Sequence, residues 1–423
     1  MMRSMYSGVS GLRLHQLKMD VIGNNIANVN TVGYKRGQVN FQEVFSQVVR
    51  GAGAPQEGRG GTNPQQIGLG LKLGSINTVF TKGPTQRTDN PTDLMIDGEG
   101  FFMITDDPKY ENIYYTRAGN FVLDREGYLV TPDGFKVLGI NDKGEYAPIM
   151  INRSEVAPPS ASTTIEFIGN LDSRFKDSEE FLTDTVVKDS LGNSYKVNFK
   201  FTKTANPNEW NLEVVNVINL ATGEAINPAP TSSPQTLTFD NGGFLTNATK
   251  TFEIQFSGTD TYYFGSDSKN SKLVVDFSKI TQFANENDVK GFDVPDQNGQ
   301  LGKSAGFLTG FAVDASGVIT GSFTNGEKKP LGQLVLAKFD NPMGLQKVGN
   351  NFFESTPNSG EPQIGKPSSS GFGTINPGAL EMSNVDLSME FTEMITTQRG
   401  FQANSRVITT TDEMLQELVN MKR

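Results

Sequence analysis

The C-terminal end of the chain carries a long amphipathic pattern, and this pattern limits the possible folds more than any other feature. From Leu387 to Val419, apolar residues recur at steps of three, four or seven positions, as they do on one face of a helix. A helix from Asp386 to Met421 would contain 36 residues. It would measure about 54 Å, well beyond an ordinary globular helix. Such a helix needs a partner along its apolar face.

A shorter pattern of the same kind lies at the N-terminus. Between positions 5 and 29, apolar residues again follow steps of three, four or seven, which predicts a second amphipathic helix. Gly8, Gly11 and Gly23 each destabilise this helix by up to about 1 kcal/mol relative to alanine. We therefore expect the first helix to depend on contacts with another part of the protein.

The two ends differ in charge, which favours their pairing as a coiled-coil-like inner core. Residues 1–36 have a net charge of +4, and residues 383–423 have a net charge of −2. Two interpretations remain open: a hairpin within one chain, or helices that complete their burial against copies of the same chain. The second interpretation predicts a polymerisation core made of Val9, Leu12, Met19, Ile22, Ile26, Leu387, Phe391, Met394, Phe401, Ile408 and Leu415.

The sequence between the two helices predicts β-structure. Short β-rich runs alternate with turn residues at a spacing of about 8–12, which is typical of antiparallel sheets. The expected fold class is α+β, mainly β, with two antiparallel β-rich domains, one inserted in the other. The expected divisions are a core helix at 1–29, an extended linker at 30–71, an inner β domain in two halves at 72–150 and 299–375, an inserted outer β domain at 151–298, and a second core helix at 376–423.

The composition excludes several classes of function. The chain has no cysteine and a single histidine, His15, so thiolate chemistry and two-histidine metal sites are impossible. The net charge of −10 is unlike that of a nucleic-acid-binding protein. The sequence contains no run of 18 consecutive apolar residues, so no membrane span is predicted. Gly8, Gly11 and Arg13 interrupt the apolar core that a secretory signal would need. We expect no cofactor, no metal, no nucleic acid and no membrane insertion.

An asparagine-rich segment, NNIANVNTVGYKR, follows the first helix at residues 24–36. Side-chain amides near a helix end satisfy backbone groups and tolerate left-handed conformations. Together with SGVSGLRLHQLKMDVIGNN, the segment resembles the N-terminal signature of the bacterial flagellar rod and hook family. Residues 379–421 are similar to the C-terminal signature of that family. The signature residues are Asn24, Asn25, Ile26, Ala27, Asn28, Asn30, Gly33, Tyr34, Lys35, Ser383, Asn384, Val385, Asp386, Gln398 and Arg399.

The resemblance implies a structural subunit and not an enzyme. It implies self-assembly into a curved hollow tube that transmits torque from rod to filament as a universal joint. Such a subunit would be exported without a cleaved signal and would lie outside the cell, in the flagellar hook. Implied partners are copies of the chain itself, a distal rod protein, a hook cap protein, a hook–filament junction protein and the flagellar export apparatus.

Two alternatives stay open at this point. Within the family, the chain could be a distal rod subunit, although the central insertion of about 140 residues favours the hook-forming members. From another class, it could be a secreted β-rich carbohydrate hydrolase that acts through two carboxylates. That alternative gives no reason for terminal helices of opposite charge.

Overall fold

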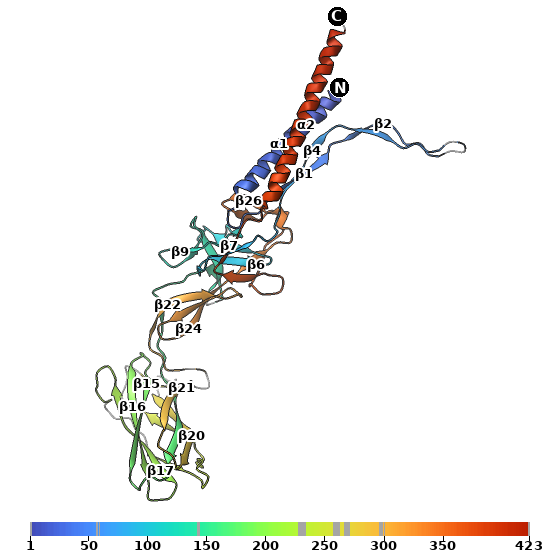
Figure 1. Cartoon of the computed structure of the whole chain (residues 1–423). Coiled ribbons are helices and arrows are strands. Elements are labelled where there is room, and N and C mark those ends of the chain that lie inside the picture. The colour runs from blue at the N-terminus through green and yellow to red at the C-terminus, as the bar shows by residue number, and fades with distance from the viewer. Residues whose placement is uncertain are drawn as a thin grey trace. The chain divides into compact units, whose positions relative to one another are not determined.

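The chain divides into two compact units (Figure 1). Unit 1 comprises Met1–Asn152, Phe311–Thr320 and Pro330–Arg423, and unit 2 comprises Arg153–Gly310 and Gly321–Lys329. The fold class predicted from the sequence, α+β and mainly β with terminal helices, is confirmed. The structure, a computed structural model, describes residues 2–55, 58, 60–141, 144–226, 234–256, 263–265, 271–295, 299 and 301–421.

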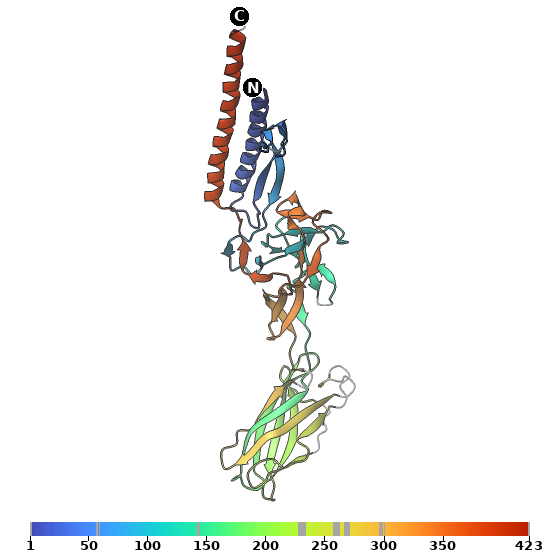
Figure 2. The ribbon, with the colours of Figure 1, turned by 90° about the vertical axis from the view of Figure 1, so that its right-hand side faces the viewer.

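The two helices belong to unit 1 and run antiparallel. Helix α1 (Met2–Ala27) and helix α2 (Leu387–Asn420) lie side by side in both views (Figure 1, Figure 2), and α2 continues beyond the start of α1. Asp386 caps α2 by accepting hydrogen bonds from the backbone N–H groups of Ser388 and Met389. Both helices predicted from the apolar pattern are therefore present at the two ends of the chain.

The segment expected as an extended linker contains a two-stranded ribbon. Strand β1 pairs with β4, and β2 pairs with β3 further out, so the chain leaves along one edge and returns along the other. Val48 and Ile67 are exposed on this ribbon. The tip of the ribbon is rich in glycine and proline, and this composition did not indicate that the strands before and after the tip would pair. The strand bounds are β1 (Gly37–Glu43), β2 (Ser46–Arg50), β3 (Gln65–Gly68) and β4 (Leu71–Thr78).

The main sheet of unit 1 follows the order β11–β7–β8–β27–β26, with antiparallel neighbours throughout. Its core is aromatic: Phe101, Tyr115, Phe339 and Phe353 pack edge to face. The remaining elements of this unit are β5 (Thr85–Arg87), β6 (Leu94–Asp97), β7 (Phe101–Thr105), β8 (Tyr114–Thr116), β9 (Val122–Leu123), β10 (Leu129–Val130), β11 (Lys136–Asn141), β12 (Tyr146–Pro148), β25 (Leu336–Lys338), a 3-10 turn at Pro342–Gly344, β26 (Gln346–Gly349), β27 (Phe352–Glu354), β28 (Gln363–Gly365), β29 (Thr374–Pro377) and β30 (Ala379–Glu381).

Unit 2 contains two four-stranded sheets, β19–β20–β14–β21 and β15–β16–β17–β18. Their alternating apolar residues form one core that includes Phe167, Phe199 and Trp210, all fully buried. One pair, β14–β20, is parallel, and the chain between these strands, which includes the other sheet, provides the long crossover that a parallel pair needs. The bounds are β14 (Thr164–Asp172), β15 (Glu180–Lys188), β16 (Ser194–Lys203), β17 (Glu209–Asn219), β18 (Gln235–Thr238), β19 (Thr251–Gln255), β20 (Lys272–Phe283) and β21 (Lys290–Val294).

Short strands lie where the chain passes from one unit to the other. Strand β13 (Val156–Ala157) pairs with the start of β22 (Gly306–Val313). Strands β22, β23 (Val318–Phe323) and β24 (Lys328–Leu334) each have residues in both units. The domain limits expected from the sequence stay predictions, and the limit placed at 298 lies outside the described residues.

Candidate functional site

The two terminal helices pack closely because small residues lie along their seam. A Cβ atom on Gly11 would lie 2.6 Å from the side-chain nitrogen of Asn404, and a Cβ atom on Gly400 would lie 2.7 Å from the ring of His15. The glycines that destabilise an isolated α1 therefore allow it to approach α2. Next to this seam, Lys18 Nζ lies 3.1 Å from Glu393 Oε2.

The residues of the predicted polymerisation core differ in burial within the single chain: one is buried, most are half-buried and three are exposed. The line of residues at seven-residue spacing on α2 begins at Leu387, which is exposed, and its later members are half-buried, with Ile408 against Gly8 of α1. Phe391 lies beside this line and is exposed. The role of all these residues in polymerisation stays a prediction. Ile22 is buried; Leu12, Met19, Ile26, Met394, Phe401, Ile408 and Leu415 are half-buried; Val9, Leu387 and Phe391 are exposed.

Further apolar side chains of α2 are exposed beside these, and they lie outside the predicted polymerisation core. Ile395 continues the face of Leu387 and Phe391 in the first half of the helix. Val407, Met414 and others continue along a different side of the second half. One heptad line was read from the sequence, whereas the helix carries apolar residues on both flanks of that line. The exposed residues on this second side are Val407, Met414, Leu418 and Met421.

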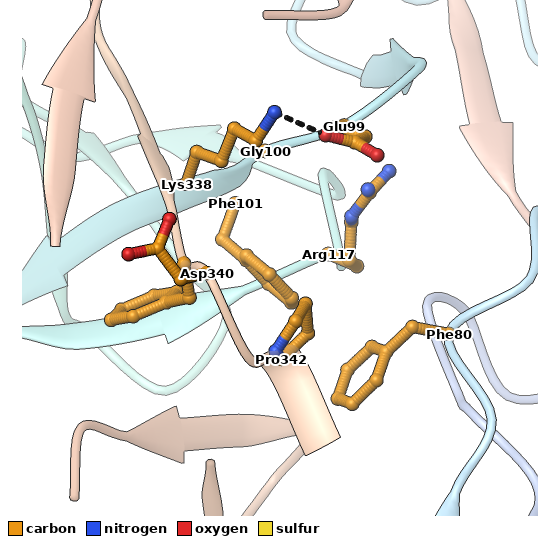
Figure 3. A pocket seen from close by; sticks show the side chains of 9 residues that line it. Phe80, Glu99, Gly100, Phe101, Arg117, Lys338, Asp340 and Pro342 are labelled. Atoms are coloured by element: carbon orange, nitrogen blue, oxygen red, sulfur yellow. Dashed lines mark ion pairs between the residues drawn. The ribbon is translucent and has the colours of Figure 1, made fainter. Parts of the chain in front are cut away.

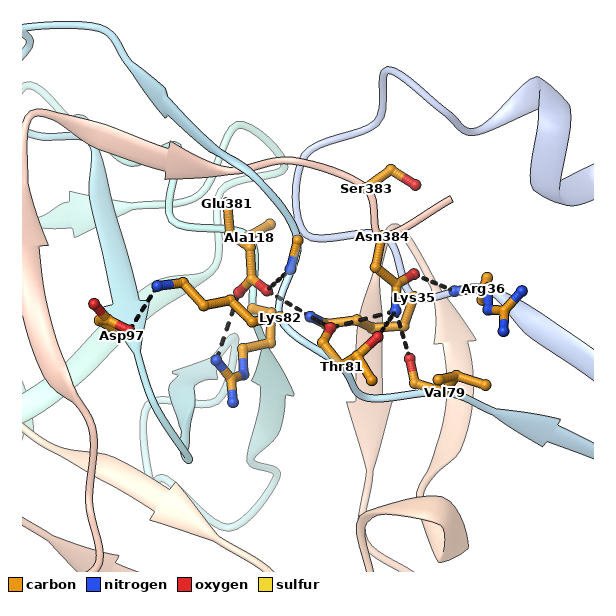
Figure 4. A network of polar contacts seen from close by, with 12 residues as sticks. Lys35, Arg36, Val79, Thr81, Lys82, Asp97, Ala118, Glu381, Ser383 and Asn384 are labelled. Carbon is orange, nitrogen blue, oxygen red and sulfur yellow. Dashed lines mark hydrogen bonds and ion pairs between the residues drawn. The ribbon is translucent and has the colours of Figure 1, made fainter. Parts of the chain in front are cut away.

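A buried polar network joins the two ends of the chain at the base of the helices (Figure 4). Lys35 Nζ lies 2.6 Å from Glu381 Oε1 and donates to the carbonyl of Thr81 at 2.8 Å. Arg117 Nη1 lies 3.5 Å from the other oxygen of Glu381, and Gly83 N–H donates to Oε1 at 2.9 Å. Burial lowers the pKa of Lys35, and the charge of Glu381 raises it in part. One carboxylate thus holds two buried cations.

A second group of contacts extends the network to both helices. The buried side chain of Asn25 donates to Gly37 O at 2.9 Å and to Glu390 Oε2 at 3.2 Å. Tyr34 donates its hydroxyl hydrogen to Asn24 Oδ1 at 2.7 Å. Arg36 Nη1 lies 3.5 Å from Glu390 Oε1. The end of α1 is therefore fixed to the first turn of α2.

The C-terminal signature contributes Asn384, which bridges two separate segments. Its side-chain oxygen accepts from Arg36 N–H at 2.8 Å, and its side-chain nitrogen donates to Val79 O at 2.8 Å (Figure 4). Gly33 has φ +69°, and a Cβ atom there would lie 2.6 Å from Ala118 N. Only glycine fits this close approach without strain. The two signatures, which lie at opposite ends of the sequence, therefore meet in one junction.

Other signature residues take smaller parts or none in this junction. Asn28 donates to Asn24 O at 2.9 Å, and Ser383 Oγ accepts from Val385 N–H. Ala27, Asn30, Gln398 and Arg399 are exposed. Glu381, Arg117 and Glu390 were not predicted as site residues. The acids of the C-terminal signature and Lys35–Arg36 of the N-terminal one were nevertheless a sign of charge pairing.

A pocket of about 370 Å³ lies beside the network (Figure 3). Phe80, Phe101 and Arg117 line it, together with Lys338, whose Nζ lies 2.6 Å from Glu99 Oε2. Lys338 is paired with Glu99 and Arg117 with Glu381, so the pocket has the character of a gap in aromatic packing and not of a reactive centre. Among the described residues, no His/Asp/Glu group is placed to hold a metal ion. No described helix is long and apolar enough to cross a bilayer.

Four family sequence models match the chain, and together they define its class. They are "Flagella basal body rod protein" at residues 5–35, "Flagellar hook protein FlgE/F/G D1 domain" at 95–170, "Flagellar basal body protein FlaE D2 domain" at 159–299 and "Flagellar basal body rod FlgEFG protein C-terminal" at 376–421. The class is that of the structural proteins that form the rod and hook of the bacterial flagellum, which is not a class of enzymes.

Curated relatives narrow the class. The flagellar hook protein FlgE of Borreliella burgdorferi is 39% identical over 100% of both chains, and that of Treponema pallidum is 36% identical over 100% of both. The flagellar basal-body rod protein FlgG of Bacillus subtilis is 32% identical, also over 100% of both chains. The chain belongs to the flagellar hook protein family and is a hook subunit of the bacterial flagellum, with a rod subunit as the alternative. The resemblance seen in the sequence is thereby confirmed.

A solved structure supports the fold alone. The crystal structure of the flagellar hook protein FlgE2 of Helicobacter pylori matches with a TM-score of 0.50 and 15% identity. The match covers 70% of this chain and 100% of that one.

Proposed function

We propose that the chain polymerises through its terminal helices into the tube of the hook, and that these helices form the inner wall of the tube. The observation that carries the proposal is the apolar surface left open on α2, where Phe391 is 49% exposed and Ile395 is 51% exposed in the single chain. Monomeric proteins rarely leave such a continuous surface uncovered. Copies of the same helix pair supply the missing cover.

The junction of the chain ends suits this role. Torque that reaches α1 and α2 passes to the β-structure of unit 1 through Lys35, Glu381 and Asn384, whose bonds are buried or half-buried. Buried charge-assisted bonds hold their geometry better than exposed ones. We propose that this junction transmits torque while the β-rich parts of neighbouring copies slide as the tube bends.

The same proposal includes the partners that a hook subunit needs. At its two ends, the tube would contact a distal rod protein and a hook–filament junction protein. Growth would use a hook cap protein and the flagellar export apparatus, which passes the chain without a cleaved signal. Neighbouring copies of this chain are the main partner.

The test compares the whole chain with a variant that lacks residues 1–29. We expect the purified whole chain to form tubes, seen by negative-stain electron microscopy, as its concentration rises. The shortened variant should form none, because α2 loses its only described helical neighbour, while unit 2 still unfolds cooperatively. Tubes from the shortened variant would contradict the role of the helices. A whole chain that stays monomeric at every concentration would contradict polymerisation itself.

A rod subunit is the second candidate, favoured by the likeness to the Bacillus subtilis rod protein. A rod is straight and a hook is curved, so the shape of the tubes separates the two candidates. Straight tubes only would favour the rod.

A further inference from the structure

Helix α1 carries an exposed stripe on the side that faces away from α2. Met2, Tyr6, Val9 and Arg13 follow one another at steps of four, three and four, which places them on one side of the helix. Met2 is 61% exposed, Tyr6 is 70% exposed, and Val9 and Arg13 are exposed too. Arg13 makes no ion pair with any described residue. The stripe therefore combines apolar side chains with one free positive charge.

Helix α2 carries a matching stripe in its last turns. Thr410, Met414, Glu417 and Met421 follow the same steps of four, three and four. Glu413 and Leu418 flank them, and the six residues together line one hollow of the surface. Within the described part of the chain, neither glutamate has an ion-pair partner. The stripe on α2 is thus apolar and negative where the stripe on α1 is apolar and positive.

These two stripes do not meet within one chain. At about 100° per residue, the stripe on α1 lies opposite the seam, and the stripe on α2 lies on a flank about a third of a turn from the seam. The seam is made by residues such as Gly8 and Gly11 on α1 and Asn404 and Ile408 on α2. Among the residues that the structure describes in unit 1, none covers either stripe.

We propose that the last turns of α2 in one copy dock on the first turns of α1 in a second copy. In an antiparallel arrangement, Met421 lies against Met2, Met414 lies against Val9, and Glu413 reaches Arg13. This inference rests on the proposed polymerisation and names one contact that carries it. The second copy is the occupant because it offers both the opposite charge and the same residue spacing.

The direction of the helices agrees with an open polymer. Helices α1 and α2 already run antiparallel in a single chain, so two copies that point the same way place them antiparallel as well. The contact joins two different surfaces, and contacts of this kind build open helical assemblies when rotation does not close a ring. Each copy keeps one stripe free for the next copy.

Two charge reversals test the contact. The variant Arg13→Glu places a glutamate opposite Glu413 of the next copy, and Glu413→Arg places an arginine opposite Arg13. Each variant alone should need at least about tenfold more protein to polymerise than the unchanged chain, because every contact then repels. An equal mixture should polymerise within about threefold of the unchanged chain, because the two variants alternate. Sedimentation of polymer at graded concentrations measures all four samples.

The control is Asp412→Arg, which reverses the neighbouring charge on a different side of α2. Mixing it with Arg13→Glu should not restore polymerisation. The inference is overturned if either single variant polymerises like the unchanged chain, if the equal mixture is no better than its components, or if Asp412→Arg rescues as well as Glu413→Arg. An unchanged chain that never polymerises would instead refute the proposed function, so the two failures are distinguishable. Circular dichroism of each variant confirms that these surface changes leave it folded.

Discussion

Unit 2 buries a core of large apolar residues, whereas the terminal helices leave many of theirs exposed. In unit 2, Phe167, Phe199 and Trp210 are fully buried between two sheets that the chain supplies itself. In α2, Phe391 and Leu418 are exposed, because α1 covers only one side of that helix. Unit 2 therefore carries its own hydrophobic core, whereas the helix pair has a core that one chain cannot complete.

Hydrogen exchange tests this contrast, and we expect the largest difference between the two regions in their amide exchange rates. Backbone amides of β16 and β17 should exchange at least about a thousandfold more slowly than those of α1 near Tyr6, because opening of the helix end breaks few buried contacts. Within α1, protection should rise from Tyr6 toward Asn25, which the junction holds. Mass spectrometry or NMR of a verified monomer measures both. Uniform protection along α1 would show that a single chain completes its helical core.

A pair of matched phenylalanine substitutions sharpens the comparison. Phe199→Ala should lower the free energy of unfolding of unit 2 by about 3–5 kcal/mol, because it leaves a cavity between the sheets. Phe391→Ala should lower the stability of the monomer by less than about 0.5 kcal/mol, because the ring is half exposed there. Urea denaturation of both variants provides the measurement. The second variant should nevertheless polymerise poorly, and normal polymerisation would remove Phe391 from the predicted core.

The junction offers a third way to separate the two regions. Glu381→Gln leaves Lys35 and Arg117 as buried cations without a counter-charge, which should destabilise unit 1 by about 3 kcal/mol. Unit 2 should keep its own unfolding transition. The control is Asp97→Asn, which breaks the exposed pair with Lys82 and should cost less than about 1 kcal/mol. Equal effects of the two substitutions would mean that burial does not decide the value of these pairs.

The smallest expected effect is a dependence of helix-pair stability on pH, through His15 at the seam of the helices. Burial, followed by the charge of Lys18, lowers the pKa of His15 below its ordinary value of 6.5. The unfolded chain then binds a proton more readily than the folded one, so the stabilising contribution is complete above about pH 6.5 and is lost as the pH falls toward the folded pKa. His15→Gln should remove this dependence. Helical circular dichroism of both proteins between about pH 7.5 and pH 5.5 checks it; identical curves would contradict the prediction.

The sequence predicts the helices well because their signal is local. The spacing of apolar residues and the capping side chain of Asp386 lie within the helix that they specify. The same holds for the alternating residues of β16, where SYKVNFKF places every second side chain in the core. The ribbon of β1 to β4 was missed, because its pairing joins segments on both sides of a tip rich in glycine and proline.

The junction was out of reach for a different reason. Asn25, Tyr34, Lys35 and Asn384 were predicted as signature residues through a resemblance, which gives no contacts between them. Lys35 and Glu381 are separated by 346 positions. Pairing over that distance leaves no periodic pattern, so a single sequence shows the charges but not which of them meet.

Because β13 pairs with β22, the segment between these two strands could be replaced by a foreign domain. Val156 lies opposite Phe307 and Ala157 lies opposite Gly306, so the strands that lead into and out of the intervening segment are neighbours. A foreign domain whose own ends lie about 5 Å apart would fit between them without stretching the chain. Chimaeras of this design would display an enzyme or an epitope at every subunit of a self-assembling fibre.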